Sequence, residues 1–182
     1  MQDIAGEINC SLNKVKYWMV KHGIPTRSIS EAVYIKNNPN GDPFKIKTPR
    51  NKNEALLKGL GLGLYWGEGT KANKVSVRLG NTDPALINNF IKFLIRCYNI
   101  DKKDLKFGLQ LFNDINPEEA LHFWRKYLKV TKNQFQKVVV TPSRGPGTYR
   151  KKVKFGVLTV YYHNRKLRDI ICEELKKLGF YG

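Results

Sequence analysis

The feature that most constrains this chain is an apolar segment, residues 54–67, which reads as one helix despite its glycines. A glycine inside a helix costs about 1 kcal/mol relative to alanine, so three interior glycines cost about 3 kcal/mol. Gly59, Gly63 and Gly67 recur every four residues and line one face, along which a second backbone can approach closely. We predict a helix-packing interface on this face, formed by Leu56, Gly59, Leu60, Gly63 and Gly67.

The residue that ends this helix is acidic. Glu68 lies at the negative end of the helix dipole, where a carboxylate is mildly unfavourable. If the partner is the same helix of a second copy, two Glu68 carboxylates meet, and such a pair needs a cation or a shared proton. Mg²⁺ suits this role because it binds hard oxygen ligands and bridges carboxylates to substrate phosphates. The spacing alone also allows a helix that packs within its own chain, with Glu68 in solvent.

The charge of the chain indicates a polyanionic partner. The 182 residues include 33 Lys and Arg against 15 Asp and Glu, which gives a formal net charge of +18 and a pI near 9.9. A hydrophobic content of 41% and an aromatic content of 12% exclude a disordered basic tail. A folded protein that binds nucleic acid is therefore expected.

Neither a membrane nor an oxidising compartment is indicated by the sequence. The longest apolar stretch, residues 55–66, contains Lys58 and is shorter than the roughly 20 residues of a membrane span. Cys10, Cys97 and Cys172 form no CxxC motif, and no signal peptide is recognisable. We expect an intracellular, cytoplasmic protein that binds no membrane.

The chain divides into a helix-turn-helix-like segment over residues 1–25, a basic linker over residues 26–52 and a main domain over residues 53–182. In the first part, apolar positions at helical spacing predict two short helices, the second capped by Ser11. The residues on its outer face, expected to contact DNA, are Asn13, Lys14 and Lys16. A plain helical hairpin would give the same pattern.

The main domain alternates helices with strands and is predicted to be α+β. The predicted strands cover residues 74–80, 105–112, 136–141 and 153–162, the first as part of a short hairpin. Besides residues 54–67, helices are predicted to begin at Asp83-Pro84, at Asn116-Pro117 and at Arg165.

The segment Gly61-Leu62-Gly63-Leu64-Tyr65-Trp66-Gly67-Glu68-Gly69 resembles the signature motif of the LAGLIDADG homing endonucleases. Gly63, Leu64, Glu68 and Gly69 match the motif, whereas Gly61 and Trp66 replace its first Leu and its non-catalytic Asp. Over residues 53–182 the predicted elements are similar to the αββαββα order of this family, with one additional helix over residues 117–128.

The resemblance implies a homodimer joined by two motif helices, with the saddle-shaped antiparallel sheet of each subunit on the DNA major groove. It implies that Glu68 of each chain, helped by the backbone carbonyl of Gly67, binds a divalent metal ion. A basic residue near the start of the last helix often assists in this family, which indicates Arg165 first and Lys166 second. The family usually has Asp where Glu68 stands, and Glu keeps the charge.

Strand alternation predicts which side chains face the DNA. In the major groove Arg reads guanine and Gln reads adenine, whereas most cations contact phosphate. The residues expected on this surface are Lys74, Ser76, Arg78, Lys106, Gln110, Arg144, Arg150, Lys151, Lys152, Lys154 and Lys166.

These observations favour a sequence-specific double-strand DNA endonuclease of homing type, which hydrolyses phosphodiesters with Mg²⁺ as a homodimer. A non-cleaving transcription regulator on a degenerate form of the same fold fits the same residues. RNA binding is also compatible with the same basic faces.

His22, His122 and His163 are isolated and form no metal-ligand spacing.

Overall fold

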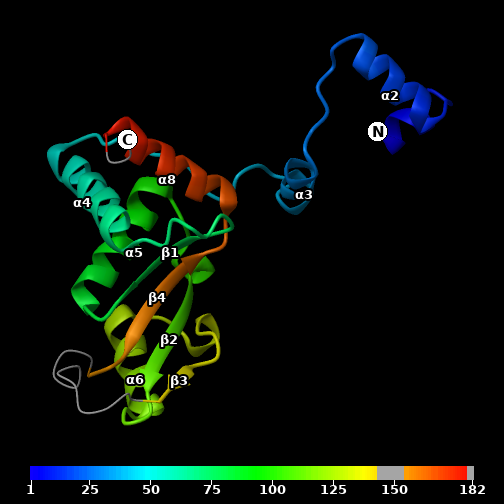
Figure 1. Ribbon diagram of the computed structural model, residues 1–182. Helices are drawn as coiled ribbons and strands as arrows, with labels where there is room; N and C mark the ends of the chain where they lie inside the picture. The colour runs from blue at the N-terminus through cyan, green and yellow to red at the C-terminus, as the bar shows by residue number, and fades with distance from the viewer. Residues whose placement is uncertain (143–153, 180–182) are drawn as a thin grey trace. The chain divides into compact units, whose positions relative to one another are not determined.

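The computed structural model describes residues 1–142 and 154–179, and these residues form two compact units, Met1–Pro43 and Phe44–Gly182 (Figure 1). The smaller unit contains helices α1 (Gln2–Glu7) and α2 (Leu12–Lys21), which contact each other, and helix α3 (Ile29–Asn37). The Ser11 hydroxyl accepts a hydrogen bond from the Lys14 N–H and caps α2. The two short helices expected in residues 1–25 are therefore present.

Helix α3 lies where a linker was expected. Its start is a capping box, in which the Ser28 hydroxyl accepts from the Glu31 N–H and the Glu31 carboxylate accepts from the Ser28 N–H. These hydrogen bonds also hold the pKa of the exposed Glu31 below its ordinary value. The prediction of a linker throughout residues 26–52 is thus wrong for α3, because the Ser-x-x-Glu signal was overlooked among basic residues.

The end of the expected linker belongs to the larger unit. Phe44 is buried in its core. The Lys45 N–H donates to the Tyr98 carbonyl at 2.9 Å, and the Lys47 N–H donates to the Cys97 carbonyl at 2.8 Å. The larger unit therefore begins at Phe44 rather than at residue 53.

The larger unit is α+β, as predicted. Its elements in chain order are α4 (Lys52–Glu68), β1 (Val77–Asn81), α5 (Pro84–Tyr98), η1 (Lys102–Asp104), β2 (Lys106–Phe112), α6 (Pro117–Leu128), η2 (Lys132–Gln134), β3 (Val139–Thr141), β4 (Val157–Tyr162) and α8 (Arg165–Lys177). Side-chain caps from Asn51, Asp83, Asn116 and Asn164 start α4, α5, α6 and α8.

Within the described residues, four strands form one sheet in the order β1-β4-β2-β3 (Figure 1). Strand β4 pairs antiparallel with β1 and β2, but β3 pairs parallel with β2. The expected antiparallel sheet is therefore wrong at this edge. Helix α6 is the reason, because a helical crossover between two strands brings the second strand back in the same direction.

The hairpin expected before β1 is reduced to a single antiparallel bridge. Gly69 and Leu79 form this bridge, and the Thr70 N–H donates to the Arg78 carbonyl at 2.9 Å. The chain between them makes a turn in which the Asn73 side chain accepts from the Val75 and Ser76 N–H groups.

The core lies between one face of the sheet and the helices. Along each of β1, β2 and β4 buried residues alternate with more exposed ones, so the sheet has one buried and one accessible face. Helix α5 packs against the buried face and against α4 and α6. The accessible sheet face and the outer side of α4 are the surfaces on which the sequence predicts DNA contacts and dimerisation.

Candidate functional site

The predicted interface residues of α4 share one face of the helix. A Cβ added at Gly59, Gly63 or Gly67 would have no heavy atom of the described chain within 4 Å, outside its own helix turn. Leu56 is 61% exposed and Leu60 is 47% exposed beside them. We call these residues, Leu56, Gly59, Leu60, Gly63 and Gly67, the α4 stripe. Nothing in the part of the chain that the structure describes explains why its glycines lack side chains.

The opposite face of α4 is filled from within the chain. Leu62 and Tyr65 are buried, and the Tyr65 ring stacks on Phe90 with centroids 6.0 Å apart. A Cβ at Gly61 would overlap the ring of Phe93 on α5. The glycines of α4 thus have two roles, with Gly61 serving the internal contact.

Glu68 is exposed at the last residue of α4. The Gly69 N–H closes the helix on the Tyr65 carbonyl at 2.9 Å, and the Lys71 ammonium donates to the Trp66 carbonyl. The Gly67 carbonyl accepts no hydrogen bond from any described residue. A carboxylate and a carbonyl oxygen are therefore both available at this end of α4, and both are hard ligands of the kind that Mg²⁺ binds.

One chain supplies few acidic groups at this point. Among residues 1–142 and 154–179, no three His, Cys, Asp or Glu side chains are grouped so that they could hold a metal ion. The donor set of Glu68 and Gly67 fits a divalent cation only if other ligands, such as a second copy or substrate phosphates, complete it.

The start of α8 carries three basic residues with different environments. Arg165 is largely exposed and forms an ion pair with Asp169, with Nε and Oδ2 3.6 Å apart. Lys166 is exposed. Arg168, whose side chain is only 15% exposed, bonds Asp169 at 2.8 Å and also donates to the Lys71 carbonyl, just beyond Glu68.

Arg168 therefore connects α8 to the loop that follows Glu68, a role that our sequence reasoning assigned to no residue. A signal was present in the sequence. Arg168 occupies the same helical stripe as Ile171, Cys172 and Leu175, which are buried, and an arginine in such a stripe indicates a specific polar contact.

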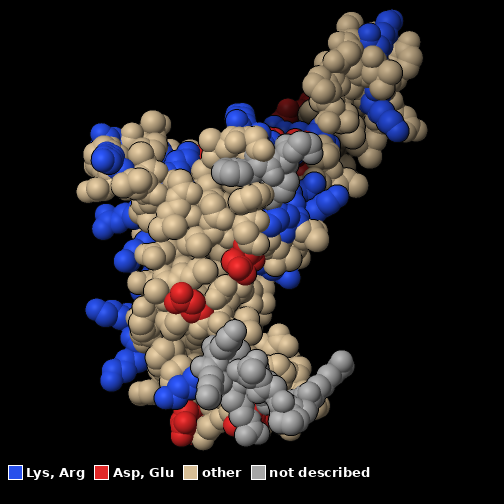
Figure 2. All heavy atoms as spheres, turned by 60° about the vertical axis from the view of Figure 1, so that its left-hand side comes forward, with Lys and Arg blue, Asp and Glu red and all other residues tan. Residues whose placement is uncertain are grey.

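The accessible face of the sheet contains the predicted Arg78, Lys106 and Gln110, on β1 and β2. Lys74 is exposed in the turn before β1, and Lys154 is exposed beside the ring of Phe155. On the face visible in Figure 2, Lys and Arg side chains predominate over Asp and Glu.

Ser76 does not belong to the accessible surface, which corrects our prediction. It is fully buried, and its hydroxyl bonds the Asn73 side chain and accepts from Arg78 Nε. The alternation rule failed here because β1 begins only at Val77, so residues 74–76 follow the turn rather than the strand.

Other predicted DNA contacts lie elsewhere. Asn13, Lys14 and Lys16 are exposed on α2 in the smaller unit. Arg144, Arg150, Lys151 and Lys152 lie outside the described residues.

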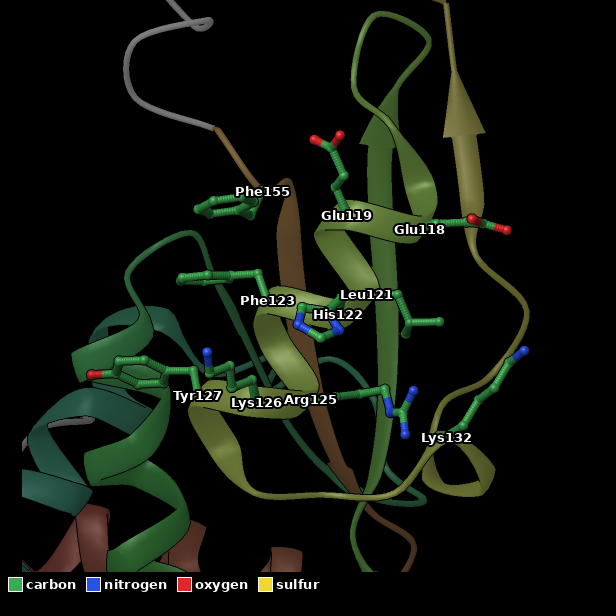
Figure 3. Close-up of a pocket in the computed structure, with 10 residues that line it drawn as sticks. All are labelled: Glu118, Glu119, Leu121, His122, Phe123, Arg125, Lys126, Tyr127, Lys132 and Phe155. Carbon is green, nitrogen blue, oxygen red and sulfur yellow. The ribbon is translucent and has the colours of Figure 1, made fainter.

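A separate hollow of about 990 Å³ lies along α6 (Figure 3). Phe155, Phe123 and Tyr127 form a column of rings there, with Phe155 and Phe123 stacked 3.8 Å apart. His122 projects from α6 without a metal-binding group around it in the described chain.

Comparison with protein-family models, with curated proteins and with solved structures finds no match to this chain. Within the described residues, no helix combines the length and the apolar character needed to cross a membrane.

Proposed function

We propose that this chain is a sequence-specific, metal-dependent DNA endonuclease of homing type that acts as a homodimer joined through α4. The observation that carries the proposal is the α4 stripe, whose three glycines face no described residue and which leads to the exposed Glu68.

The occupant that best fits the stripe is the same helix of a second copy. Each interior glycine costs helix stability, and close approach of another backbone is what glycines at this spacing offer in return. Exposed Leu56 and Leu60 supply apolar area at the margin of such a contact. A two-fold axis along the stripe brings the two Glu68 residues toward each other, because both lie at the same end of α4.

Two residues of each chain would hold the metal ion, namely Glu68 through its carboxylate and Gly67 through its carbonyl oxygen. Mg²⁺ bound there supplies charge stabilisation for phosphodiester hydrolysis. Arg168 positions the loop behind Glu68 from α8. Arg165, which pairs with Asp169, and Lys166 lie in the first turn of α8, and we expect both to contact a phosphate in the DNA complex.

The polyanion in this proposal is duplex DNA. The accessible sheet face has Arg78, Lys106 and Gln110, and a twisted antiparallel ribbon fits the major groove. The net charge of +18 supports a large electrostatic contribution to binding, which should weaken steeply with salt.

The test is cleavage of a randomised plasmid library in the presence of Mg²⁺ and, separately, of EDTA. We expect double-strand cuts at a small set of related sites with Mg²⁺ only. Glu68→Gln should abolish cleavage and leave the affinity for the selected duplex nearly unchanged, whereas Glu173→Gln, an exposed acid on α8, should change neither.

Binding measurements made beside the cleavage assay separate the alternatives. Specific duplex binding without cleavage under any divalent metal ion would instead identify a DNA-binding regulator. Stronger competition by structured RNA than by duplex DNA at fixed salt would identify an RNA-binding protein. A Glu68→Gln variant that cuts normally would exclude Glu68 from the reaction.

A further inference from the structure

The accessible sheet face contains an ordered row of side chains that crosses three strands. The strand register pairs Arg78 of β1 with Tyr161 of β4, and Tyr161 with Lys106 of β2. Strands β1, β4 and β2 contain no Asp or Glu, so no acid within them neutralises Arg78. This row is a cationic surface with one aromatic ring at its centre.

Arg78 is held at two points. Its Nε donates to the Ser76 hydroxyl at 2.8 Å, and its Cζ lies 5.1 Å from the centre of the Tyr161 ring. Ser76 is itself fixed, because its N–H and hydroxyl both donate to the Asn73 side chain. The two Nη groups of Arg78 donate to no described residue, so the end of the guanidinium is left for an external acceptor.

The position of Tyr161 depends on a missing side chain. A Cβ at Gly108 would come within 3.0 Å of Tyr161 Cε2 and of its hydroxyl oxygen, so only glycine leaves full room for this ring over β2. His163 stacks parallel to Tyr161, with ring centroids 5.9 Å apart. Burial and the cations of Arg78 and Lys106 lower the pKa of His163, which favours a neutral neighbour for Arg78 near pH 7.

The lysines nearby lack this organisation. Lys74 and Lys106 have neither an ion pair nor a side-chain hydrogen bond among the described residues, and a lysine acts as a flexible point charge. Such residues suit phosphate contacts, which contribute affinity without sequence preference. An arginine that is held through Nε and by an aromatic ring, with both Nη groups available, suits a planar acceptor pair instead.

We propose that Arg78 is the specificity-determining residue of the sheet face and reads one guanine in the major groove, with its Nη groups donating to O6 and N7. Ser76 and Tyr161 are the positioning residues that hold Arg78 in this geometry. The inference rests on the proposed binding of duplex DNA, but not on cleavage, on the metal ion or on the dimer.

The test is selection of binding sites from randomised duplexes by the full chain and by Arg78→Lys, read by sequencing. We expect that Arg78→Lys lowers the preference for G·C at one position of the selected site by about 5- to 150-fold. The preferences at the other positions should stay as they are in the unchanged chain. Ser76→Ala and Tyr161→Leu should weaken preference at that same pair, and Tyr161→Phe, which keeps the ring, should retain it.

Lys74→Ala is the matched control. It should lower affinity for all sequences alike and reduce the salt slope of binding by about 1, without changing the selected site. A selected site that Arg78→Lys leaves unchanged would overturn the assignment of Arg78 and leave the proposed DNA binding intact. Failure to enrich any sequence would overturn both.

Discussion

Gly61 on α4 lies directly against Phe93 on α5, so closely that a Cβ at position 61 would overlap the ring. Two residues before it, Gly59 faces no described residue within the same 4 Å limit. Alanine is a better helix former than glycine at both positions, but only at position 61 does the added Cβ meet a described neighbour. The two glycines therefore form a matched pair for substitution.

We expect Gly61→Ala to lower the free energy of unfolding by about 1–3 kcal/mol, because Phe93 must move. Gly59→Ala should raise it by about 0.5–1 kcal/mol in dilute protein without DNA, because only helix propensity changes. Urea unfolding followed by circular dichroism measures both. Equal destabilisation by the two variants would mean that Gly59 also has a close neighbour in the free protein.

Gly63→Leu should leave the subunit folded but prevent dimerisation, because a leucine side chain occupies the space that the second helix needs. Sedimentation velocity with an excess of duplex containing the selected site should give one subunit per duplex instead of two, and cleavage should be lost. Lys92→Leu, which adds the same side chain at an exposed position of α5, should preserve both. A Gly63→Leu dimer that still cuts would refute the α4 interface.

The link between α4, α5 and α8 through Glu174 should contribute to stability. The Tyr98 hydroxyl donates to Glu174 at 2.7 Å, and the Lys58 ammonium lies 2.9 Å from the same carboxylate. Burial and Glu174 raise the pKa of Tyr98 well above its ordinary value, so the hydroxyl stays a donor. Tyr98→Phe should lower the free energy of unfolding by about 1–2 kcal/mol, whereas Tyr127→Phe on the exposed side of α6 should have little effect.

Affinity for DNA should depend on pH through His163. Its pKa in the free protein lies below the ordinary value of 6.5, so the folded chain binds fewer protons there than the unfolded chain. His163 therefore makes its full contribution to the free energy of unfolding above pH 6.5. This contribution is lost as the pH falls through the pKa of His163 in the folded chain. Nearby phosphates favour the imidazolium form, so DNA binding takes up a proton and tightens over the same fall in pH.

Fluorescence anisotropy between pH 7.5 and 5.5 (roughly one unit on each side of an ordinary histidine pKa) measures this effect. His163→Gln should remove the part of the pH dependence that belongs to this site. His122→Gln, at an exposed position on α6, should not. Equal pH dependence with and without His163 would assign the proton uptake to another group.

Local signals predicted most element positions well. The Asp83-Pro84 and Asn116-Pro117 pairs gave the first residues of α5 and α6, because cap and proline geometry is set within a few neighbouring residues. The spacing of Gly59, Gly63 and Gly67 likewise predicted a shared helix face. Local periodicity carries this information without knowledge of the rest of the chain.

What the sequence left open depends on contacts between distant segments. Phe93 is the reason for Gly61, and no spacing rule connects those positions. The parallel direction of β3 follows from the path of α6, which our strand assignments did not use. Ser76 was misplaced because the alternation rule assumes a strand, whereas the Asn73 turn delays β1 to Val77. Arg168 was overlooked because its partner, the Lys71 carbonyl, is a backbone atom far away in sequence.

Phe44 is buried in the larger core, and the Lys45 and Lys47 amides bond to the end of α5. These contacts decide where the N-terminal unit can be exchanged for another segment. A fusion made just ahead of Phe44 keeps every one of those backbone bonds, so a foreign segment can replace residues 1–43 without removing a residue of the larger core. A junction placed after Lys52, at the border that the sequence predicted between the linker and the main domain, would instead remove Phe44 from that core. Chimeras of the first kind should therefore retain the thermal stability of the larger unit, and those of the second kind should lose part of it.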